Sequence, residues 1–132
     1  MKNTYLFFLA ILVGIMLLNT SELKANRNIL ADSAAILFVE TIHDYGTIKK
    51  DSDGTWDFTF TNTGKIPLVL SNVQTSCGCT TPSWPREPIA PGKKGIIKVK
   101  YNTSSTGGFQ KTITVYSNAK TVTLTIKGSV QE

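Results

Sequence analysis

The sequence is poor in the side chains that most often bind metals or form disulfide frameworks. It contains one histidine, His43, and two cysteines, Cys77 and Cys79, which are separated only by Gly78. Two cysteines this close cannot bridge the two sheets of a sandwich, so the inter-sheet disulfide typical of antibody domains is excluded. The sequence also suggests no Ser–His–Asp constellation, and we therefore expect a protein that is not an enzyme.

Charge of either sign is sparse and dispersed. The formal net charge is +5, and hydrophobic residues make up 41% of the chain, a proportion typical of a globular protein. The lysines are distributed in pairs and singly, as at Lys49–Lys50 and Lys93–Lys94. Neither a clustered basic helix nor an aromatic stacking motif is present, so we expect no nucleic-acid partner.

The first segment has the pattern of an export signal. Lys2 precedes an apolar run at residues 5–18, which is shorter than the roughly 20 residues that a membrane-spanning helix needs. No cysteine lies directly after this run, which excludes lipid attachment at a processed cysteine. We predict a signal peptide at residues 1–25, a leader or linker at 26–35, and an exported protein, periplasmic or secreted, that is neither lipid-anchored nor inserted in the membrane after cleavage.

The rest of the chain alternates apolar and polar residues with a period of two, which is typical of β-strands with one buried face. Turn signals such as Asp53–Gly54 and Pro91–Gly92 recur between these segments. The residues predicted to form the core are Trp56, Phe58, Phe60, Ile97, Val99, Tyr101, Ile113, Val115, Val122, Leu124 and Ile126.

Strands with one apolar face must bury that face against a second sheet. We therefore predict an all-β fold at residues 36–132, an immunoglobulin-like β-sandwich of about seven antiparallel strands. The first strand is expected at residues 36–41, and residues 45–48 are expected to continue it after a kink.

Five short motifs in order make the chain recognisable. They are His43–Asp44–Tyr45–Gly46–Thr47–Ile48, Phe60–Thr61–Asn62–Thr63–Gly64, Ser76–Cys77–Gly78–Cys79–Thr80, Pro88–Ile89–Ala90–Pro91–Gly92 and Tyr116–Ser117–Asn118. In this combination the chain resembles the bacterial domain-of-unknown-function family fifteen-seventy-three over residues 38–130. The resemblance implies a small exported immunoglobulin-like sandwich, related to major sperm protein domains, with a cysteine pair. It implies no established activity.

The cysteine pair is compatible with four uses. It can form a local disulfide, bind a metal through two thiolates, form a mixed disulfide with a partner protein, or pack as two small side chains. Because Gly78 has no Cβ, we expect it to permit a tight ring, and a strained ring is easier to reduce. No basic residue adjoins the pair in sequence, Arg86 being the nearest, and this counts against an activated thiol.

No cofactor is expected, but a metal remains an alternative use of the pair. Soft sulfur ligands favour Cu(I), and zinc is an option if further ligands are added. If the end of the first strand lies at the same end of the sandwich as the cysteine loop, His43 would complete a three-ligand site with Cys77 and Cys79. The competing interpretation of His43 is a structural hydrogen-bonding residue beside Asp44.

Trp84 lies in the stiff segment Pro82–Ser83–Trp84–Pro85 and is interpreted either as a lid over the end of the core or as a partner contact. We predict a non-enzymatic exported domain that acts in protein binding or envelope assembly, with another envelope protein or itself as partner. The alternative is a periplasmic thiol-redox or copper- or zinc-binding protein centred on Cys77 and Cys79.

Overall fold

The computed structural model describes residues 32–132, and residues 33–132 form one compact unit. The predicted signal peptide and most of the predicted leader lie outside the described residues. The last leader residues belong to the domain, because Ser33 and Ala35 accept backbone hydrogen bonds from Lys65 and Thr63. The domain therefore begins three residues before the predicted boundary.

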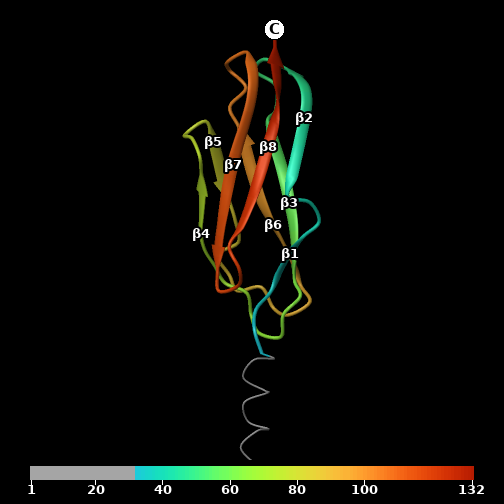
Figure 1. Ribbon diagram of the computed structural model, residues 1–132, viewed down its shortest axis with the longest axis vertical. Helices are drawn as coiled ribbons and strands as arrows, with labels where there is room; N and C mark the ends of the chain where they lie inside the picture. Colours follow the sequence, from blue (N-terminus) through green and yellow to red (C-terminus); the bar gives the residue numbers. More distant parts are fainter. Residues whose placement is uncertain (1–31) are drawn as a thin grey trace, which may run out of the picture. The chain divides into compact units, whose positions relative to one another are not determined.

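The described residues form eight strands and no helix. The strands are β1 (Ile36–Phe38), β2 (Ile42–Lys49), β3 (Thr55–Asn62), β4 (Leu70–Thr75), β5 (Thr80–Ser83), β6 (Lys94–Tyr101), β7 (Gly107–Ser117) and β8 (Val122–Gln131). They make two four-stranded sheets, the first in the order β1-β3-β6-β5 and the second in the order β2-β8-β7-β4. In Figure 1, β7 and β8 of the second sheet lie in front of β3 and β6 of the first. The all-β sandwich is confirmed, with eight strands where about seven were predicted.

Two details of the predicted topology were wrong. Residues 36–41 and 45–48 are not one kinked strand, because the chain leaves the first sheet after Phe38 and enters the second at Ile42. As a result β2 runs parallel to β8, whereas every other pairing of strands is antiparallel. The segment at Pro82 is also part of a strand, β5. This strand lies at the edge of its sheet, where a proline that lacks an N–H group is tolerated.

The alternating strands bury their apolar faces between the two sheets. Phe58, Phe60, Ile97, Val99, Ile113, Val115, Leu124 and Ile126 have exposed fractions of 0–1%. Tyr101 is also buried, while Trp56 and Val122 pack against the core from its rim. Leu68, Val73 and Val130 are further core residues.

Asn62, at the end of β3, is a fully buried polar residue that connects four backbone groups. Its Nδ2 donates to the carbonyl oxygens of Ile66 and Ile89, at 2.8 and 2.9 Å. Its Oδ1 accepts from the amides of Gly64 and Ala35, at 2.9 and 3.4 Å. One side chain therefore provides hydrogen-bond partners for backbone groups of three segments: the one before β1, the β3–β4 connection and the β5–β6 connection.

Replacing Asn62 by Ala should lower the free energy of unfolding by about 2–4 kcal/mol, because it leaves several partly buried backbone groups without partners. Chemical denaturation measures this change. The matched control is Asn102→Ala, which removes an exposed amide with a single backbone contact, to Ser104. Equal effects of the two substitutions would contradict this role of Asn62.

Candidate functional site

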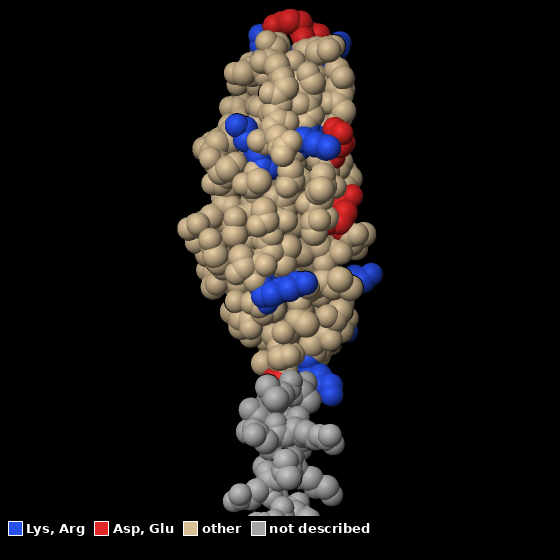
Figure 2. All heavy atoms as spheres, in the orientation of Figure 1, with Lys and Arg blue, Asp and Glu red and all other residues tan. Residues whose placement is uncertain are grey.

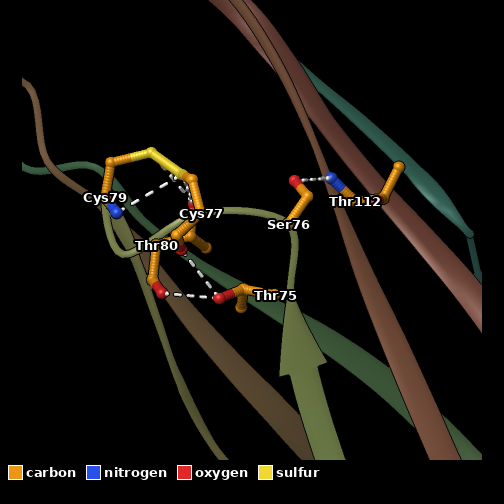
Figure 3. The surroundings of a disulfide bond; sticks show 6 residues. All are labelled: Thr75, Ser76, Cys77, Cys79, Thr80 and Thr112. Carbon is orange, nitrogen blue, oxygen red and sulfur yellow. Dashed lines mark hydrogen bonds between the residues drawn. A yellow bond between two sulfur atoms is a disulfide. The ribbon is translucent and has the colours of Figure 1, made fainter.

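The cysteine pair lies in the loop that carries the chain from one sheet to the other. β4 is an edge strand of the second sheet and β5 is an edge strand of the first, and Cys77, Gly78 and Cys79 lie between them. The structure joins the two sulfur atoms in a disulfide (Figure 3). The Cα atoms of Cys77 and Cys79 are 5.3 Å apart, which is within the range of ordinary disulfides.

Hydrogen bonds fix this loop to both sheets. The amide of Ser76 donates to the carbonyl of Thr112 on β7, and the amide of Thr112 donates to Ser76 Oγ, at 2.9 and 3.1 Å (Figure 3). On the other side the amide of Asn102 donates to the carbonyl of Cys79 at 2.8 Å. Inside the loop, Thr75 Oγ1 lies 2.8 Å from the carbonyl oxygen of Cys77. The sulfur atoms are therefore held in a fixed position.

The two sulfur atoms have different surroundings. The amide of Cys79 points at Cys77 Sγ from 3.3 Å. The hydroxyl of Thr80, a buried residue, lies 3.8 Å from Cys77 Sγ and 3.9 Å from Cys79 Sγ. Cys79 packs against the core, and only Cys79 of the pair lines the cleft beside the loop. The disulfide is thus asymmetric.

The expected role of Gly78 is corrected by the structure. Its φ angle is not positive, and a Cβ added at this position would meet no atom within 4 Å. Neither the backbone conformation nor the packing therefore requires glycine here. Gly78 is exposed and lines the cleft beside Cys79, where it adds no side chain.

A cleft of about 480 Å³ adjoins Cys79 and contains the basic residue that sequence reasoning missed. Lys100 lines this cleft, because β6 places it directly opposite Thr81 on β5. Asp51 and Asn102 line the same cleft. Arg86 is the nearest basic residue in sequence, but the fold also brings Lys100 to the cleft that Cys79 lines. Lys100 is distant in sequence, and only the pairing of β5 with β6 brings it to the loop.

His43 is not brought to the cysteine pair. It lies on β2, while the cysteine loop leaves β4, and these strands are the two opposite edges of the second sheet. The His43 ring stacks on Trp56, with ring centroids 3.5 Å apart and an interplanar angle of 8°, and Tyr45 meets it edge-on. In the part of the chain that the structure describes, no three His, Cys, Asp or Glu side chains are grouped to hold a metal ion. The three-ligand site with Cys77 and Cys79 is thus not formed.

Trp84 lies between the core and a groove on the surface. Its ring is partly buried against the core, and its Nε1 is buried without a hydrogen-bond partner. The Arg86 guanidinium lies over the ring, 3.9 Å from its centroid, in a cation–π contact. Trp84 also lines a groove on the outer face of the first sheet, together with Ile96 and Lys98.

The packing of His43 should make stability depend on pH. Burial lowers the pKa of His43 below 6.5, and the nearby carboxylates of Glu40 and Asp44 only partly oppose this shift. The folded protein therefore favours neutral His43. The contribution of this residue to the free energy of unfolding is complete above pH 6.5, and it is lost as the pH falls toward the lowered pKa that His43 has in the folded protein. Thermal unfolding followed between about pH 7.5 and about pH 5 should show a falling midpoint, with a smaller slope in His43→Gln. Identical slopes in the two proteins would contradict this assignment.

The fold has relatives among solved structures, although no curated protein matches the chain. A protein of unknown function from Porphyromonas gingivalis W83 is similar at 19% identity with a TM-score of 0.66, covering 75% of this chain and 48% of that one. The chain therefore spans about half of that protein's length. The PapD-like domain 7 of human CEP192 is similar at 7% identity with a TM-score of 0.61, covering 76% and 87% of the two chains.

A third similar structure is the CsuC–CsuE chaperone–tip adhesion subunit complex of Acinetobacter baumannii. The identity is 12% and the TM-score 0.54, covering 74% of this chain and 58% of that one. At these identities the similarities show the fold alone. In residues 32–132 no helix is long and apolar enough to cross a membrane.

A family model described as a protein of unknown function, DUF1573, matches residues 36–130. This range includes the cysteine loop, Asn62 and all eight strands except the last residue of β8. The chain therefore belongs to the DUF1573 family.

Proposed function

We propose that this chain is an exported domain that acts by binding a protein partner, a role that involves no catalysis. The partner docks on the outer face of the first sheet. The partner is another envelope protein or a second copy of the chain. The observation that carries the proposal is a row of exposed apolar side chains across that face. Val39 is 80% exposed and Ile96 is 45% exposed.

The strand register places Val39 and Ile96 on the same face, on either side of Thr59. The amide of Val39 donates to the carbonyl of Thr59, and Thr59 is paired with Ile96 on the neighbouring strand. Leu37, which is 60% exposed, lies on the same face opposite Thr61. The groove lined by Trp84 and Ile96 continues this apolar row toward β5. Exposed apolar surface of this kind, bordered by polar groups, is typical of protein-binding sites.

The outer face of the second sheet exposes the apolar side chains of Ile42 on β2 and Tyr116 on β7. Its central strands carry threonine pairs, Thr112 with Thr125 and Thr114 with Thr123. Figure 2 shows the side of the molecule on which β7 and β8 lie in Figure 1, and its lysine, arginine and acidic side chains are scattered rather than gathered in one patch. Exposed apolar residues alone therefore do not select one face, and the feature that favours the first sheet is the groove lined by Trp84 and Ile96.

The similarity to a chaperone that was solved with a tip adhesion subunit supports a binding role at the level of fold. Export is proposed from the signal-like segment before the domain. Binding at the apolar row requires no cofactor and no nucleic acid. A three-ligand copper or zinc role is not supported by residues 32–132, where His43 is stacked on Trp56 at the far edge of the second sheet.

Photo-crosslinking in the cells that produce the protein tests the docking face. A benzophenone side chain placed at Val39 should give a discrete adduct, and one placed at exposed Thr123 on β8 should not, because only Val39 lies on the apolar row. An adduct of twice the chain mass indicates self-association, and any other mass indicates a different protein. A second change, Ile96→Asp, should abolish the Val39 adduct without lowering the unfolding midpoint, because Ile96 points out of the core.

Equal adducts from the Val39 and Thr123 positions would contradict a specific docking face. Persistence of the Val39 adduct in Ile96→Asp would contradict the contribution of the apolar row. The unfolding midpoint of each variant, measured by circular dichroism, shows that these results do not come from misfolding.

A further inference from the structure

We propose that the Cys77–Cys79 disulfide oxidises a pair of cysteines in another polypeptide, with Cys79 as the sulfur that is attacked and Cys77 as the leaving group. This activity goes beyond docking on the outer face of the first sheet and does not depend on it. Three observations support it: the asymmetric surroundings of the two sulfur atoms, the cleft beside Cys79, and the uncovered solvent side of the loop.

The surroundings of the sulfur atoms identify the leaving group. The Cys79 amide, 3.3 Å from Cys77 Sγ, is positioned to donate to a thiolate on Cys77, and the Thr80 hydroxyl is 3.8 Å from the same atom. Donors directed at a sulfur stabilise its anion, and the better stabilised thiolate leaves faster in disulfide exchange. Among the described residues, Cys79 Sγ has only the more distant contact with Thr80, at 3.9 Å. Attack at Cys79 with release of Cys77 is therefore favoured.

The cleft identifies the route of the incoming thiolate. Cys79 lines the cleft and Cys77 does not. Lys100 supplies a positive charge in the same cleft, which favours the approach of an anionic sulfur, whereas Asp51 contributes the opposite charge. Gly78 places no side chain over the entrance, and a Cβ there would point into open space.

The size and openness of the cleft indicate a polypeptide substrate. A space of about 480 Å³ accepts a cysteine side chain together with adjoining backbone. The exposed residues Gly78 and Asn102 border this space. We therefore assign the thiols of a polypeptide as the substrate and treat a small thiol such as glutathione as the alternative outcome.

The reaction balances without any further oxidant. A substrate thiolate attacks Cys79 Sγ, the Cys77–Cys79 bond breaks, and its electron pair remains on Cys77 as a thiolate. The second substrate thiolate then attacks the substrate sulfur in the mixed disulfide and releases Cys79 as a thiolate. The substrate has lost two electrons and gained a disulfide, and the two protons from its thiols are taken up by Cys77 and Cys79.

The test mixes the purified full chain, oxidised beforehand with oxidised glutathione, with a reduced peptide that contains two cysteines. N-ethylmaleimide stops the reaction at early times, and mass spectrometry maps the products. We expect the trapped peptide on Cys79 with the blocker on Cys77, and a rate of peptide oxidation above that given by oxidised glutathione alone. Lys100→Gln should slow the reaction by about two- to five-fold, as expected for the loss of one exposed charge contact.

Lys98→Gln is the matched control, because Lys98 points outward from the same strand two residues away but lines the Trp84 groove instead of the cleft. Its rate should equal that of the unchanged protein. Replacing both Cys77 and Cys79 with Ser should abolish peptide oxidation and leave the Val39 adduct in place, which separates a failure of this activity from a failure of docking.

Several results would overturn the proposal. One is trapping of the peptide on Cys77, and another is an equal rate of peptide oxidation by Lys98→Gln and Lys100→Gln. A third is peptide oxidation no faster than with oxidised glutathione alone. A fourth is that the thiols of Cys77 and Cys79 stay free after exposure to oxidised glutathione. A reaction with reduced glutathione that is as fast as with the peptide would overturn the assignment of a polypeptide substrate.

Discussion

The architecture depends on one constraint: on each side of the sandwich, the chain leaves one sheet and enters the other. Residues 39–41 carry it from β1 to β2, and the cysteine loop carries it from β4 to β5. Of the five connections between the described strands that change sheet, these two join edge strands of both sheets, so each one closes a side of the core. Trp56, stacked on His43, donates a hydrogen bond to Glu40 in the first crossing, and the Cys77–Cys79 disulfide constrains the second. Asn62 fixes the backbone at one end of the sandwich.

The two proposed activities are neighbours on the first sheet. Lys98 lines the groove beside Trp84, and Lys100, two residues farther along β6, lines the cleft beside Cys79. Alternate residues of a strand are about 7 Å apart on the same face. A polypeptide docked over Ile96 would therefore lie within a few residues of the disulfide. Binding and thiol exchange are compatible on one surface, although each is tested by its own variants.

The sequence was sufficient to predict the sandwich and most of the core, because alternation with a period of two depends only on local order. Phe58 and Phe60, for example, are both fully buried. The parallel pairing of β2 could not be predicted, because a change of sheet leaves no mark in the alternation. The position of Lys100 beside Cys79 depends on the register between β5 and β6, which is a long-range property. The prediction that His43 lies beside the cysteines was wrong because strand order, another long-range property, places β2 and β4 at opposite edges of the second sheet.

The disulfide between Cys77 and Cys79 closes the crossing from β4 to β5. The most direct test is the intact mass of the protein isolated from its own cellular compartment after rapid blocking of free thiols. We expect a species that lacks two hydrogens relative to the reduced chain and carries no blocking group. A species that carries two blocking groups would show that Cys77 and Cys79 are free thiols in that compartment, and that no disulfide closes the crossing from β4 to β5.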